Sequence, residues 1–513
     1  MSEPKLRGAV MVCGTASNSG KSLLVAGLCR LLSRRGVSVA PFKGQNMSLN
    51  SVVTRDGSEI GRAQGAQAEA AGIEPDVAMN PVLLKPVGER RSQVIVMGRP
   101  WRVLDAADYQ RAKPELRDTV LDALAGLRRR FDVVVAEGAG SPAEINLMKA
   151  DLVNLGLADA AGMPAVIVGD IDRGGVFAHL FGTVELLPGD LRRCVRGFII
   201  NKLRGDPALL GSGPSQLEER TGVPTLGVVP WLDGITVDAE DSLALGASSI
   251  WGGGRADATG GNPIDVAVLR YPRISNFTDL DAMAVEPGVS VRWVEHASQL
   301  ADPDLVVLPG SKSTVGDLGW LCKRGFDTEL ARMLAGSRAP VVLGICGGYQ
   351  MLGRRIVDEA GIESAPGTTD ALGLLDVDTT FVTEKRTVRR HGRERSSGAP
   401  VTGYEIHHGR VETGDGVEAW FELDGADGGS EPEGVADPGR GIFATTLHGV
   451  LENDEFRAGL LEAVAQRRGK HRERSGVSFA GIRRAQVDRV ADACEAHLDL
   501  DALWRIIAAG ELA

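Results

Sequence analysis

The sequence predicts an α/β protein made of two doubly wound domains, each with a parallel sheet between helices, followed by a helical C-terminal tail. Two observations support this fold class. Short apolar segments alternate with helical patterns in both halves of the chain, as in sheets covered on both faces. Between the halves, a glycine-rich stretch at residues 246–263 has no periodicity and reads as a linker. We therefore expect domains at residues 1–245 and 264–455 and a tail at residues 456–513.

Composition and charge exclude several classes of function. The chain of 513 residues has a formal net charge of −11, which gives it no general electrostatic affinity for nucleic acid. Its six cysteines include no C-x-x-C pair, a usage typical of the reducing cytoplasm. The N-terminus lacks the apolar core of a signal peptide, and no apolar run is long enough to span a membrane. We expect a cytoplasmic protein that binds neither nucleic acid nor a membrane.

The first domain is expected to be a parallel sheet with its ligands at the C-terminal ends of the strands. Helical patterns between the strands include Lys21–Arg34, Ala106–Arg129 and Ala150–Ala161. The expected strands are Gly8–Cys13, Val37–Pro41, Val82–Leu84, Val94–Met97, Phe131–Ala136, Ala165–Gly169, Gly197–Ile200 and Leu226–Val229.

A glycine-rich stretch, GTASNSGKS, follows the first strand and precedes the first helix. It resembles a phosphate-binding P-loop, with five residues instead of four between Gly14 and Gly20. Backbone amides at such a helix N-terminus bind phosphates, Lys21 neutralises them, and the Ser22 hydroxyl is suited to Mg²⁺. The alternative is a glycine-rich turn without a ligand. The residues predicted to bind ATP here are Thr15, Asn18, Ser19, Gly20, Lys21 and Ser22.

Further polar residues follow other strands of this domain. Glu137 comes directly after the strand Phe131–Ala136, where a carboxylate is a natural Mg²⁺ partner for Ser22. Lys43, Gln45 and Asn46 follow the second strand and are candidates for binding a phosphate or a substrate carboxylate. The alternatives are a surface carboxylate and a solvated loop.

Two later stretches are weaker candidates. Asp170 and Asp172, in the stretch GDIDRGG, suggest metal or phosphate binding, with an internal Asp–Arg ion pair as the alternative. Asn201 follows the strand Gly197–Ile200 and is a candidate purine contact.

The second domain is expected to begin with the strand Ile264–Leu269. Surface loops are expected at residues 385–398, which are basic, and 413–440, which are rich in glycine and acids. The tail is amphipathic and is expected to dock on the protein's own core. The further strands are expected at Val289–Val294, Leu305–Leu308, Val341–Ile345, Leu374–Val377, Gly403–Ile406 and Ile442–Thr445.

Cys346 occupies the tip of a strand–turn–helix pattern, VVLGICGGYQMLG. The adjacent glycines allow a sharp turn, and the start of a helix favours a thiolate. Backbone amides of Gly347 and of the loop with Gly310 and Ser311 are candidate oxyanion donors. The alternative is a buried structural cysteine.

His448 is the candidate base for Cys346, because it lies just past a strand about 100 residues further along. A structural histidine is the alternative. No Glu stands two residues after His448, and Glu452, four residues on, is not assigned a role. Glu405 and His407, in GYEIHHG, are interpreted as wall or orienting residues. The group that orients His448 stays open.

These motifs resemble known families. The first half is similar to the dethiobiotin synthetase-like branch of P-loop proteins, and the second half to class I glutamine amidotransferases, which have a flavodoxin-like fold. The lack of His-x-Glu resembles the subgroup of cobyric acid and cobyrinate amidotransferases, described as Cys–His enzymes. With GQNMSLNS, GDIDRGG and RISNFTD, the chain resembles the cobyric acid synthase family from about Gly8 to Asn453.

The resemblance implies a function. It implies amidation, with ATP, Mg²⁺ and L-glutamine, of the b, d, e and g carboxylates of adenosylcobyrinate a,c-diamide in cobalamin biosynthesis. Lys21, Ser22 and Glu137 would hold MgATP, Cys346 would release ammonia with His448 shuttling protons, and an enclosed path would carry the ammonia to the acyl phosphate. No tightly bound organic cofactor is implied, and a homo-oligomer is compatible with the sequence.

Two alternatives remain open. The sister enzyme amidates the a and c carboxylates of cobyrinate or hydrogenobyrinate by the same half-reactions. A P-loop ATPase switch with a catalytically dead glutaminase-like module is the alternative of another class, and the intact Cys346 and His448 argue against it.

Overall fold

The computed structural model describes residues 6–87, 90–235, 263–425 and 427–510. The chain divides into two compact units. Unit 1 comprises Met1–Ser48, Ser58–Asp238 and Arg483–Ala513, and unit 2 comprises Leu49–Gly57 and Ala239–Ile482. The linker expected at residues 246–263 lies, apart from Pro263, outside the described residues.

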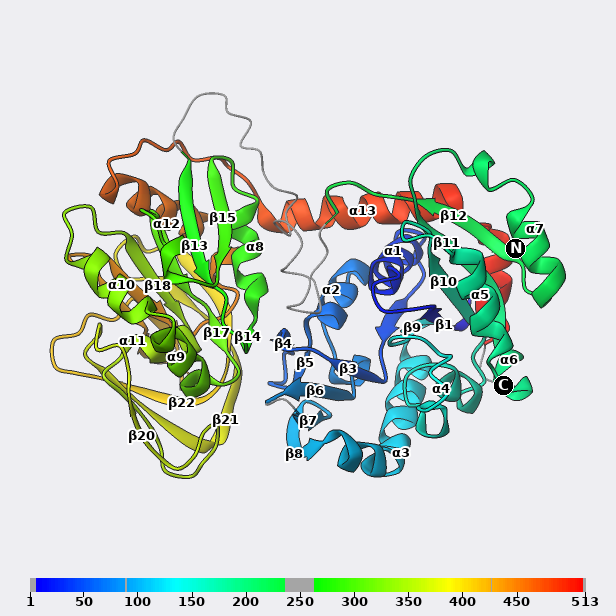
Figure 1. The fold of residues 1–513 in the computed structure, drawn as a ribbon, viewed down its shortest axis with the longest axis horizontal. Helices are drawn as coiled ribbons and strands as arrows, with labels where there is room; N and C mark the ends of the chain where they lie inside the picture. Colours follow the sequence, from blue (N-terminus) through cyan, green and yellow to red (C-terminus); the bar gives the residue numbers. More distant parts are fainter. Residues whose placement is uncertain (1–5, 88–89, 236–262, 426, 511–513) are drawn as a thin grey trace. The chain divides into compact units, whose positions relative to one another are not determined.

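Unit 1 is built on a six-stranded sheet in which every neighbouring pair of strands is parallel. The order β12-β11-β10-β1-β9-β2 confirms the doubly wound sheet predicted for this part of the chain (Figure 1). The strands are β1 (Gly8–Gly14), β2 (Val39–Phe42), β9 (Val133–Glu137), β10 (Ala165–Asp170), β11 (Val195–Leu203) and β12 (Thr225–Pro230).

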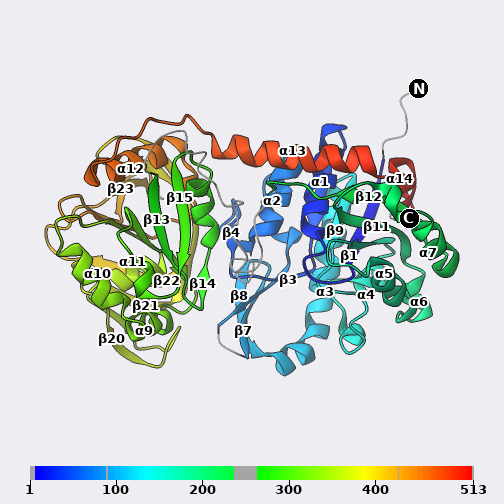
Figure 2. The same ribbon diagram turned by 45° about the horizontal axis from the view of Figure 1, so that its top comes forward.

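Helices cover both faces of this sheet, because side chains alternate between the faces along each strand. Val10 and Val12 of β1 enter a core shared with α1, α13 and α14, whereas Met11 and Cys13 enter a core shared with α3, α4 and α5 (Figures 1 and 2). The helices of unit 1 are α1 (Lys21–Arg34), α2 (Arg62–Ala71), α3 (Ala106–Arg130), α4 (Leu155–Ala160), α5 (Val176–Glu185), α6 (Gly189–Arg192), α7 (Gly213–Thr221) and α14 (Leu500–Ala508), together with α13 (Phe479–His497) from Arg483 onward.

Two predicted strands do not join the parallel sheet. The segments expected at Val82–Leu84 and Val94–Met97 lie in a separate sheet of order β3-β6-β7-β8, in which β6, β7 and β8 are antiparallel. Only four residues separate β6 from β7 and two separate β7 from β8, whereas a parallel crossover would need a dozen or more residues. The strands are β3 (Gln45–Met47), β6 (Val82–Pro86), β7 (Arg91–Val96) and β8 (Arg99–Asp105), with β5 (Glu59–Gly61) elsewhere in unit 1.

The helix expected at Ala150–Ala161 is shorter than predicted and begins only at Leu155. The Asp151 carboxylate accepts hydrogen bonds from the backbone N–H groups of Val153, Asn154 and Gly156. An Asp side chain that satisfies these amides starts the helix late, because it offers the backbone a turn instead.

Unit 2 contains a second six-stranded sheet, of order β15-β13-β16-β18-β26-β25, parallel except for the β25–β26 pair. Five of its strands match the predicted boundaries: β13 (Ile264–Leu269), β15 (Val289–Val294), β16 (Leu305–Leu308), β18 (Val341–Ile345) and β26 (Ile442–Thr445). The other elements around this sheet are β25 (Val435–Asp437), α8 (Asp281–Ala284), α9 (Thr314–Lys323), α10 (Phe326–Leu334), α11 (Gly347–Leu352) and α12 (Asp454–Arg467).

The prediction of surface loops at residues 385–398 and 413–440 is wrong. Most of the first stretch belongs to the long strand β21 (Val377–Glu394), which pairs antiparallel with β22 (Pro400–Thr413). Cross-strand pairing stabilises these strands despite their many charged residues, because strand propensity depends strongly on context. The second stretch contains strands β23 (Phe421–Asp424), β24 (Ser430–Glu433) and β25. Strands β23 and β24 belong to the sheet of β21 and β22, which also includes β19 (Arg355–Asp358) and β20 (Gly367–Asp370), whereas β25 pairs with β26.

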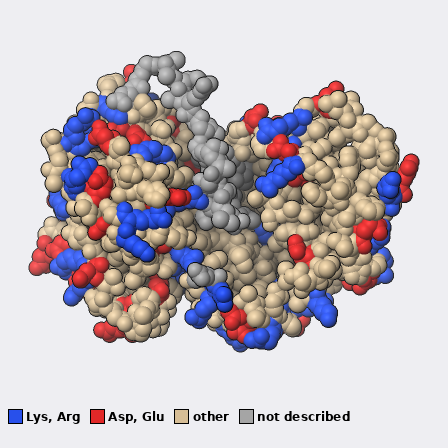
Figure 3. All heavy atoms as spheres, in the orientation of Figure 1, with Lys and Arg blue, Asp and Glu red and all other residues tan. Residues whose placement is uncertain are grey.

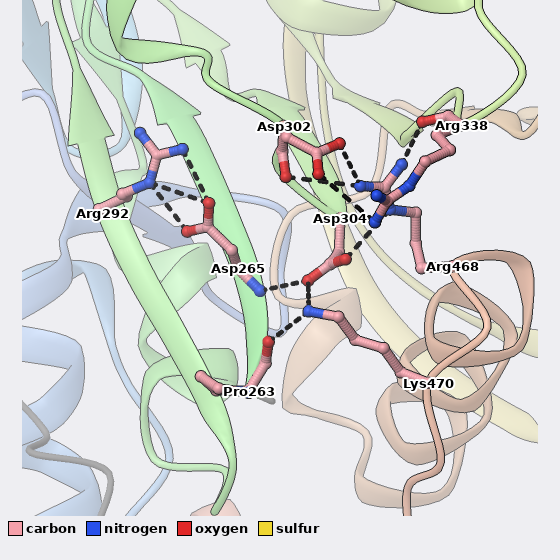
Figure 4. A network of polar contacts seen from close by, with 8 residues as sticks. All are labelled: Pro263, Asp265, Arg292, Asp302, Asp304, Arg338, Arg468 and Lys470. Atoms are coloured by element: carbon pink, nitrogen blue, oxygen red, sulfur yellow. Dashed lines mark hydrogen bonds and ion pairs between the residues drawn. The ribbon is translucent and has the colours of Figure 1, made fainter. Parts of the chain in front are cut away.

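The C-terminal residues contribute to both units. Helix α12 packs into a core of unit 2, and residues from Arg483 onward belong to unit 1. After α12, Arg468 Nε and Lys470 Nζ lie 3.1 and 2.6 Å from the two carboxylate oxygens of Asp304, which precedes β16 (Figure 4). Asp304 is buried, so the two cations compensate its charge and fix the end of α12 against the sheet.

On the face drawn in Figure 3, lysine and arginine side chains are interspersed with aspartate and glutamate side chains. Among the described residues, no helix has both the length and the apolar composition that crossing a bilayer requires.

Candidate active site

Cys346 lies at a strained turn between β18 and α11. Its φ is +51° and its ψ is −106°, a conformation that is costly for a residue with a side chain. The turn is held because Cys346 N donates to Thr445 O at 2.7 Å. A Cβ on Gly348 would lie 1.8 Å from Leu308 O, so only glycine fits there. The backbone therefore presents the thiol at the end of a rigid strand.

The predicted oxyanion loop lies beside this turn. A Cβ on Gly347 would lie 2.8 Å from Ser311 N, and one on Gly310 would lie 2.9 Å from the His448 ring. Gly310, Ser311 and Gly347 are thus close to the Cys346 turn and His448, as the sequence predicted. Their roles as oxyanion and glutamine-binding residues remain a proposal.

Asp317 supports the oxyanion loop from behind. The Ser311 hydroxyl donates to the Asp317 carboxylate at 2.6 Å, and the Arg273 N–H donates to the same group at 3.2 Å. Burial raises the pKa of Asp317 to about 7, although these hydrogen bonds oppose the rise. Sequence reasoning missed this residue, which lies on α9 with no motif of its own.

His448 is oriented by Asp279. The two groups share a hydrogen bond of 2.7 Å between Nδ1 and Oδ2, and Gly449 N donates to the other carboxylate oxygen at 2.8 Å. Tyr404 stacks on the imidazole, with ring centroids 5.6 Å apart, and exchanges two backbone hydrogen bonds with His448. His448 is 1% exposed and Asp279 is 2% exposed, so water does not compete for these contacts.

The electrostatics favour a charged imidazole. Burial alone lowers the pKa of His448, but the negative charges of Asp279 and Cys346, with hydrogen bonds to both, raise it to about 10. Such an imidazolium beside a thiol stabilises the thiolate, which is the nucleophilic form of cysteine. Cys346, His448 and Asp279 therefore have the arrangement of a nucleophile, a base and an orienting carboxylate.

Asp279 is the group in contact with His448 that the sequence alone did not identify. It belongs to the RISNFTD stretch, which had served only as part of the family resemblance, and it precedes His448 by 169 residues. Glu405 and His407, which the sequence suggested as wall or orienting residues, have other hydrogen-bond partners. Glu405 accepts from Thr446 at 3.2 Å, and His407 contacts Gly409 O at 2.6 Å. Burial lowers the pKa of His407 to about 3, so it is neutral.

The second candidate site is the P-loop of unit 1. It connects β1 to α1, and Gly20 at its end has a φ of +96°, which glycine adopts without strain. Lys21 Nζ donates to Ala16 O at 3.0 Å and to Gly140 O at 3.2 Å, so it lies across the loop. Thr15, Asn18 and Ser19 lie in the same turn.

Glu137 lies at the end of β9 and receives three side chains. Ser22 Oγ and Lys43 Nζ are 2.8 and 2.9 Å from Oε1, and Gln67 Nε2 is 2.6 Å from Oε2. Burial by itself raises the pKa of Glu137, but the Lys43 charge and the hydrogen bonds from Gln67, Lys43 and Ser22 hold it below its usual range. Sequence reasoning missed Gln67, because a single amide in α2 is recognisable only by what it contacts.

The donor atoms at this site fit a magnesium ion bound with a nucleotide. Mg²⁺ is commonly held by one or two protein oxygens and the phosphates of its substrate, and Glu137 and Ser22 place two oxygens together. No group of three or more His, Cys, Asp or Glu side chains suited to a metal occurs within the residues that the structure describes.

The weaker candidates already have protein partners. Asp170 pairs with Lys202 at 2.8 Å and Asp172 with Arg204 at 2.6 Å. Asn201 Nδ2 donates to Ser19 O at 2.9 Å and so braces the P-loop. These contacts keep the end of β11 and the residues after β10 close to the loop.

Gln45 and Asn46 are also engaged. Gln45 Oε1 accepts from Tyr109 at 2.6 Å, and Asn46 Nδ2 donates to Gln64 at 2.9 Å. Asn46 is 3% exposed. Lys43, Gln45 and Asn46 thus form an ordered strand end in unit 1, and their role toward a substrate remains a proposal.

Comparisons with protein families agree with the two sites. Residues 10–243, which include the P-loop, match the family model of the CobQ/CobB/MinD/ParA nucleotide binding domain. Residues 265–456, which include Cys346, His448 and Asp279, match the model of the CobB/CobQ-like glutamine amidotransferase domain.

Curated relatives match nearly the whole chain. It is 53% identical to the cobyric acid synthase of Nocardia farcinica, with 98% of each chain covered. It is 51% identical to that of Rhodococcus jostii, covering 99% of this chain and 97% of the relative, and 49% identical to that of Streptomyces coelicolor, covering 98% and 97%. The similarity spans both units and both candidate sites, and the chain therefore belongs to the cobyric acid synthase family.

Proposed function

We propose that this chain amidates the b, d, e and g carboxylates of adenosylcobyrinate a,c-diamide, with ammonia from glutamine and activation by ATP. The observation that carries this proposal is the contact of Asp279 with His448 beside Cys346, on a chain that also has a P-loop. An intact nucleophile, base and orienting carboxylate favour a working glutaminase over the ATPase switch with a dead glutaminase-like module.

In the glutaminase reaction, the Cys346 sulfur attacks the side-chain amide carbon of glutamine. The oxyanion that forms accepts hydrogen bonds from the backbone amides of Gly347 and the Gly310–Ser311 loop. His448 gives its proton to the leaving nitrogen, the C–N bond breaks, and a thioester and ammonia result. Water, deprotonated by His448, then hydrolyses the thioester to glutamate and restores the thiol.

In the synthetase reaction, the carboxylate oxygen of the corrinoid attacks the γ-phosphorus of ATP, and ADP leaves. The P-loop amides and Lys21 hold the phosphates and neutralise charge, which is the main protein contribution to such transfers. Ser22 and Glu137 would hold Mg²⁺, which supplies further charge neutralisation when it is bound. Ammonia then attacks the acyl phosphate, the C–O bond to phosphate breaks, and an amide and inorganic phosphate form.

The test is a mass measurement on purified protein with ATP, Mg²⁺, glutamine and candidate corrinoids. Each conversion of a carboxylate to an amide replaces an OH group by an NH2 group and lowers the mass of the corrinoid by the same small amount. Conversion of the a,c-diamide through successive amidations supports the proposal. Amidation of cobyrinate or hydrogenobyrinate at a and c, without further reaction, would favour the sister enzyme. No glutamine hydrolysis with ATP and corrinoid present would favour the ATPase switch.

We also propose that ammonia passes from Cys346 to the acyl phosphate without release. Glutamine labelled with ¹⁵N in its amide is supplied together with excess unlabelled ammonium. Product amides that keep the label support an enclosed path, whereas full dilution of the label excludes it.

A further inference from the structure

The segment Leu49–Gly57 has an unusual position. In sequence it interrupts unit 1, which comprises residues on both sides of it, but it belongs to unit 2. It directly follows β3 and the Lys43, Gln45 and Asn46 stretch that we propose as a substrate-binding element. A short chain segment therefore links that stretch covalently to the unit that holds Cys346.

The segment contacts the turn that carries Asp279. Ser51 N donates to Asn276 Oδ1 at 3.0 Å, and Phe277 N donates to Asn50 Oδ1 at 3.2 Å. The two asparagines thus exchange hydrogen bonds with each other's neighbours. Asn50 is 0% and Asn276 is 3% exposed, so water cannot replace either bond without rearrangement.

Asn276 has an unusual backbone conformation. Its φ is +49°, in the left-handed region that residues with side chains rarely adopt. Asn276 immediately precedes the single helical turn Phe277–Leu280, which includes Asp279. The hydrogen bonds from the segment hold this backbone turn, and the turn sets the position of the carboxylate.

The segment also packs near Tyr404, the second residue that holds His448 in place. Val53 packs in a small core with Tyr404 and Ile406, and Val53 O accepts from Arg389 Nε at 2.7 Å. Tyr404 is the residue that stacks on the His448 ring. One segment of nine residues therefore touches both structures that fix the imidazole, one through Asn50 and one through Val53.

We propose that Asn50 and Asn276 are positioning residues for His448, acting through Asp279. This inference rests on the proposed function. The asparagine pair fixes the turn before Phe277, the turn fixes the Asp279 carboxylate, and the carboxylate fixes the imidazole.

The test compares Asn50→Ala and Asn276→Ala with Arg55→Ala, an exposed position of the same segment. Glutamine hydrolysis is measured with and without ATP and the a,c-diamide, and amidation is also measured with ammonium as the nitrogen source. We expect both asparagine variants to lose about tenfold or more in kcat for glutamine. Amidation from ammonium and the Arg55→Ala variant should stay within about twofold of the wild type.

A second readout separates positioning from a general loss of structure. The rate at which iodoacetamide alkylates Cys346 is followed at one pH, because this rate depends on the groups that surround the thiol. In Asn50→Ala the alkylation of Cys346 should slow, while ammonium-dependent amidation reports a folded enzyme. Asn50→Asp, which keeps the acceptor oxygen, should restore part of the glutaminase activity.

Several outcomes would overturn the inference. Unchanged glutamine hydrolysis in both alanine variants would exclude the positioning role. An equal loss of glutamine-dependent and ammonium-dependent amidation would show a general structural role instead. A wild-type protein that hydrolyses no glutamine refutes the proposed function itself, and the inference falls with it.

Discussion

His448 Nδ1 and Asp279 Oδ2 are 2.7 Å apart, although 169 residues separate them in the chain. Both side chains are buried, and the second carboxylate oxygen accepts the backbone N–H of Gly449. This contact supplies the orienting acid that a His-x-Glu pattern would otherwise place two residues after the histidine. An acid from a distant turn thus completes the Cys346 site.

Asp279→Asn should reduce glutamine hydrolysis by about a hundredfold or more in kcat, because an amide neither stabilises the imidazolium nor fixes its tautomer. Ammonium-dependent amidation should be retained, since Asp279 belongs to unit 2 and the P-loop to unit 1. The matched control is Glu452→Gln, which changes the acid nearest to His448 in sequence. If Glu452→Gln were as damaging as Asp279→Asn, the assignment of the orienting acid would be wrong.

Cys346→Ala should abolish glutamine-dependent amidation and leave ammonium-dependent amidation, because it removes only the nucleophile that releases ammonia. Cys322→Ala, at an exposed cysteine, serves as the control and should keep both activities. The measurement is product formation from each nitrogen source. Equal loss of both activities in Cys346→Ala would contradict the division of roles between the sites.

Lys21→Ala should remove amidation from either nitrogen source, because the P-loop lysine neutralises the phosphates of ATP. Binding of ATP, followed by calorimetry, should weaken in parallel. A variant that keeps full activity would refute the assignment of the P-loop. Basal glutamine hydrolysis without ATP is the internal control for folding.

Lys43→Met should destabilise unit 1 by about 3 kcal/mol or more, because it leaves the Glu137 carboxylate buried without its cation. The double variant Lys43→Met with Glu137→Gln should recover part of this loss, since it removes the uncompensated charge. Denaturant unfolding of the three proteins gives the comparison. Identical unfolding midpoints for all three would show that the ion pair has no net effect on stability.

The raised pKa of His448 predicts a pH dependence of stability. The pKa is about 10 in the folded protein against about 6.5 for an unperturbed histidine, so the native state binds this proton more tightly. The stabilisation is complete below about pH 6.5 and is lost as the pH rises toward 10. Denaturant midpoints across this window should fall in the wild type and fall less in Asp279→Asn, because the Asp279 charge is the largest of the causes that raise this pKa. Parallel curves would contradict this origin.

The sequence by itself determined the elements with strong local signals. The helix Lys21–Arg34 and the strand Val341–Ile345 have the boundaries that their apolar patterns and flanking glycines predicted. Motifs that follow predicted strands, such as the P-loop and the Cys346 turn, could be placed because parallel strands present their C-terminal ends along one edge. Gly310, Ser311 and His448 also follow strands of one parallel sheet, so their position near Cys346 could be predicted in the same way.

Only the tertiary structure decided the contacts between residues far apart in sequence. The β21–β22 pair was missed because its charged residues have no strand propensity until a partner strand lies beside them. Asp279 and Gln67 lack a local signal, since a single carboxylate or amide is recognisable only by what it touches. The assignment of Leu49–Gly57 to unit 2 has the same cause: Asn50 and Asn276 exchange bonds across more than two hundred residues, and no local pattern encodes such a contact.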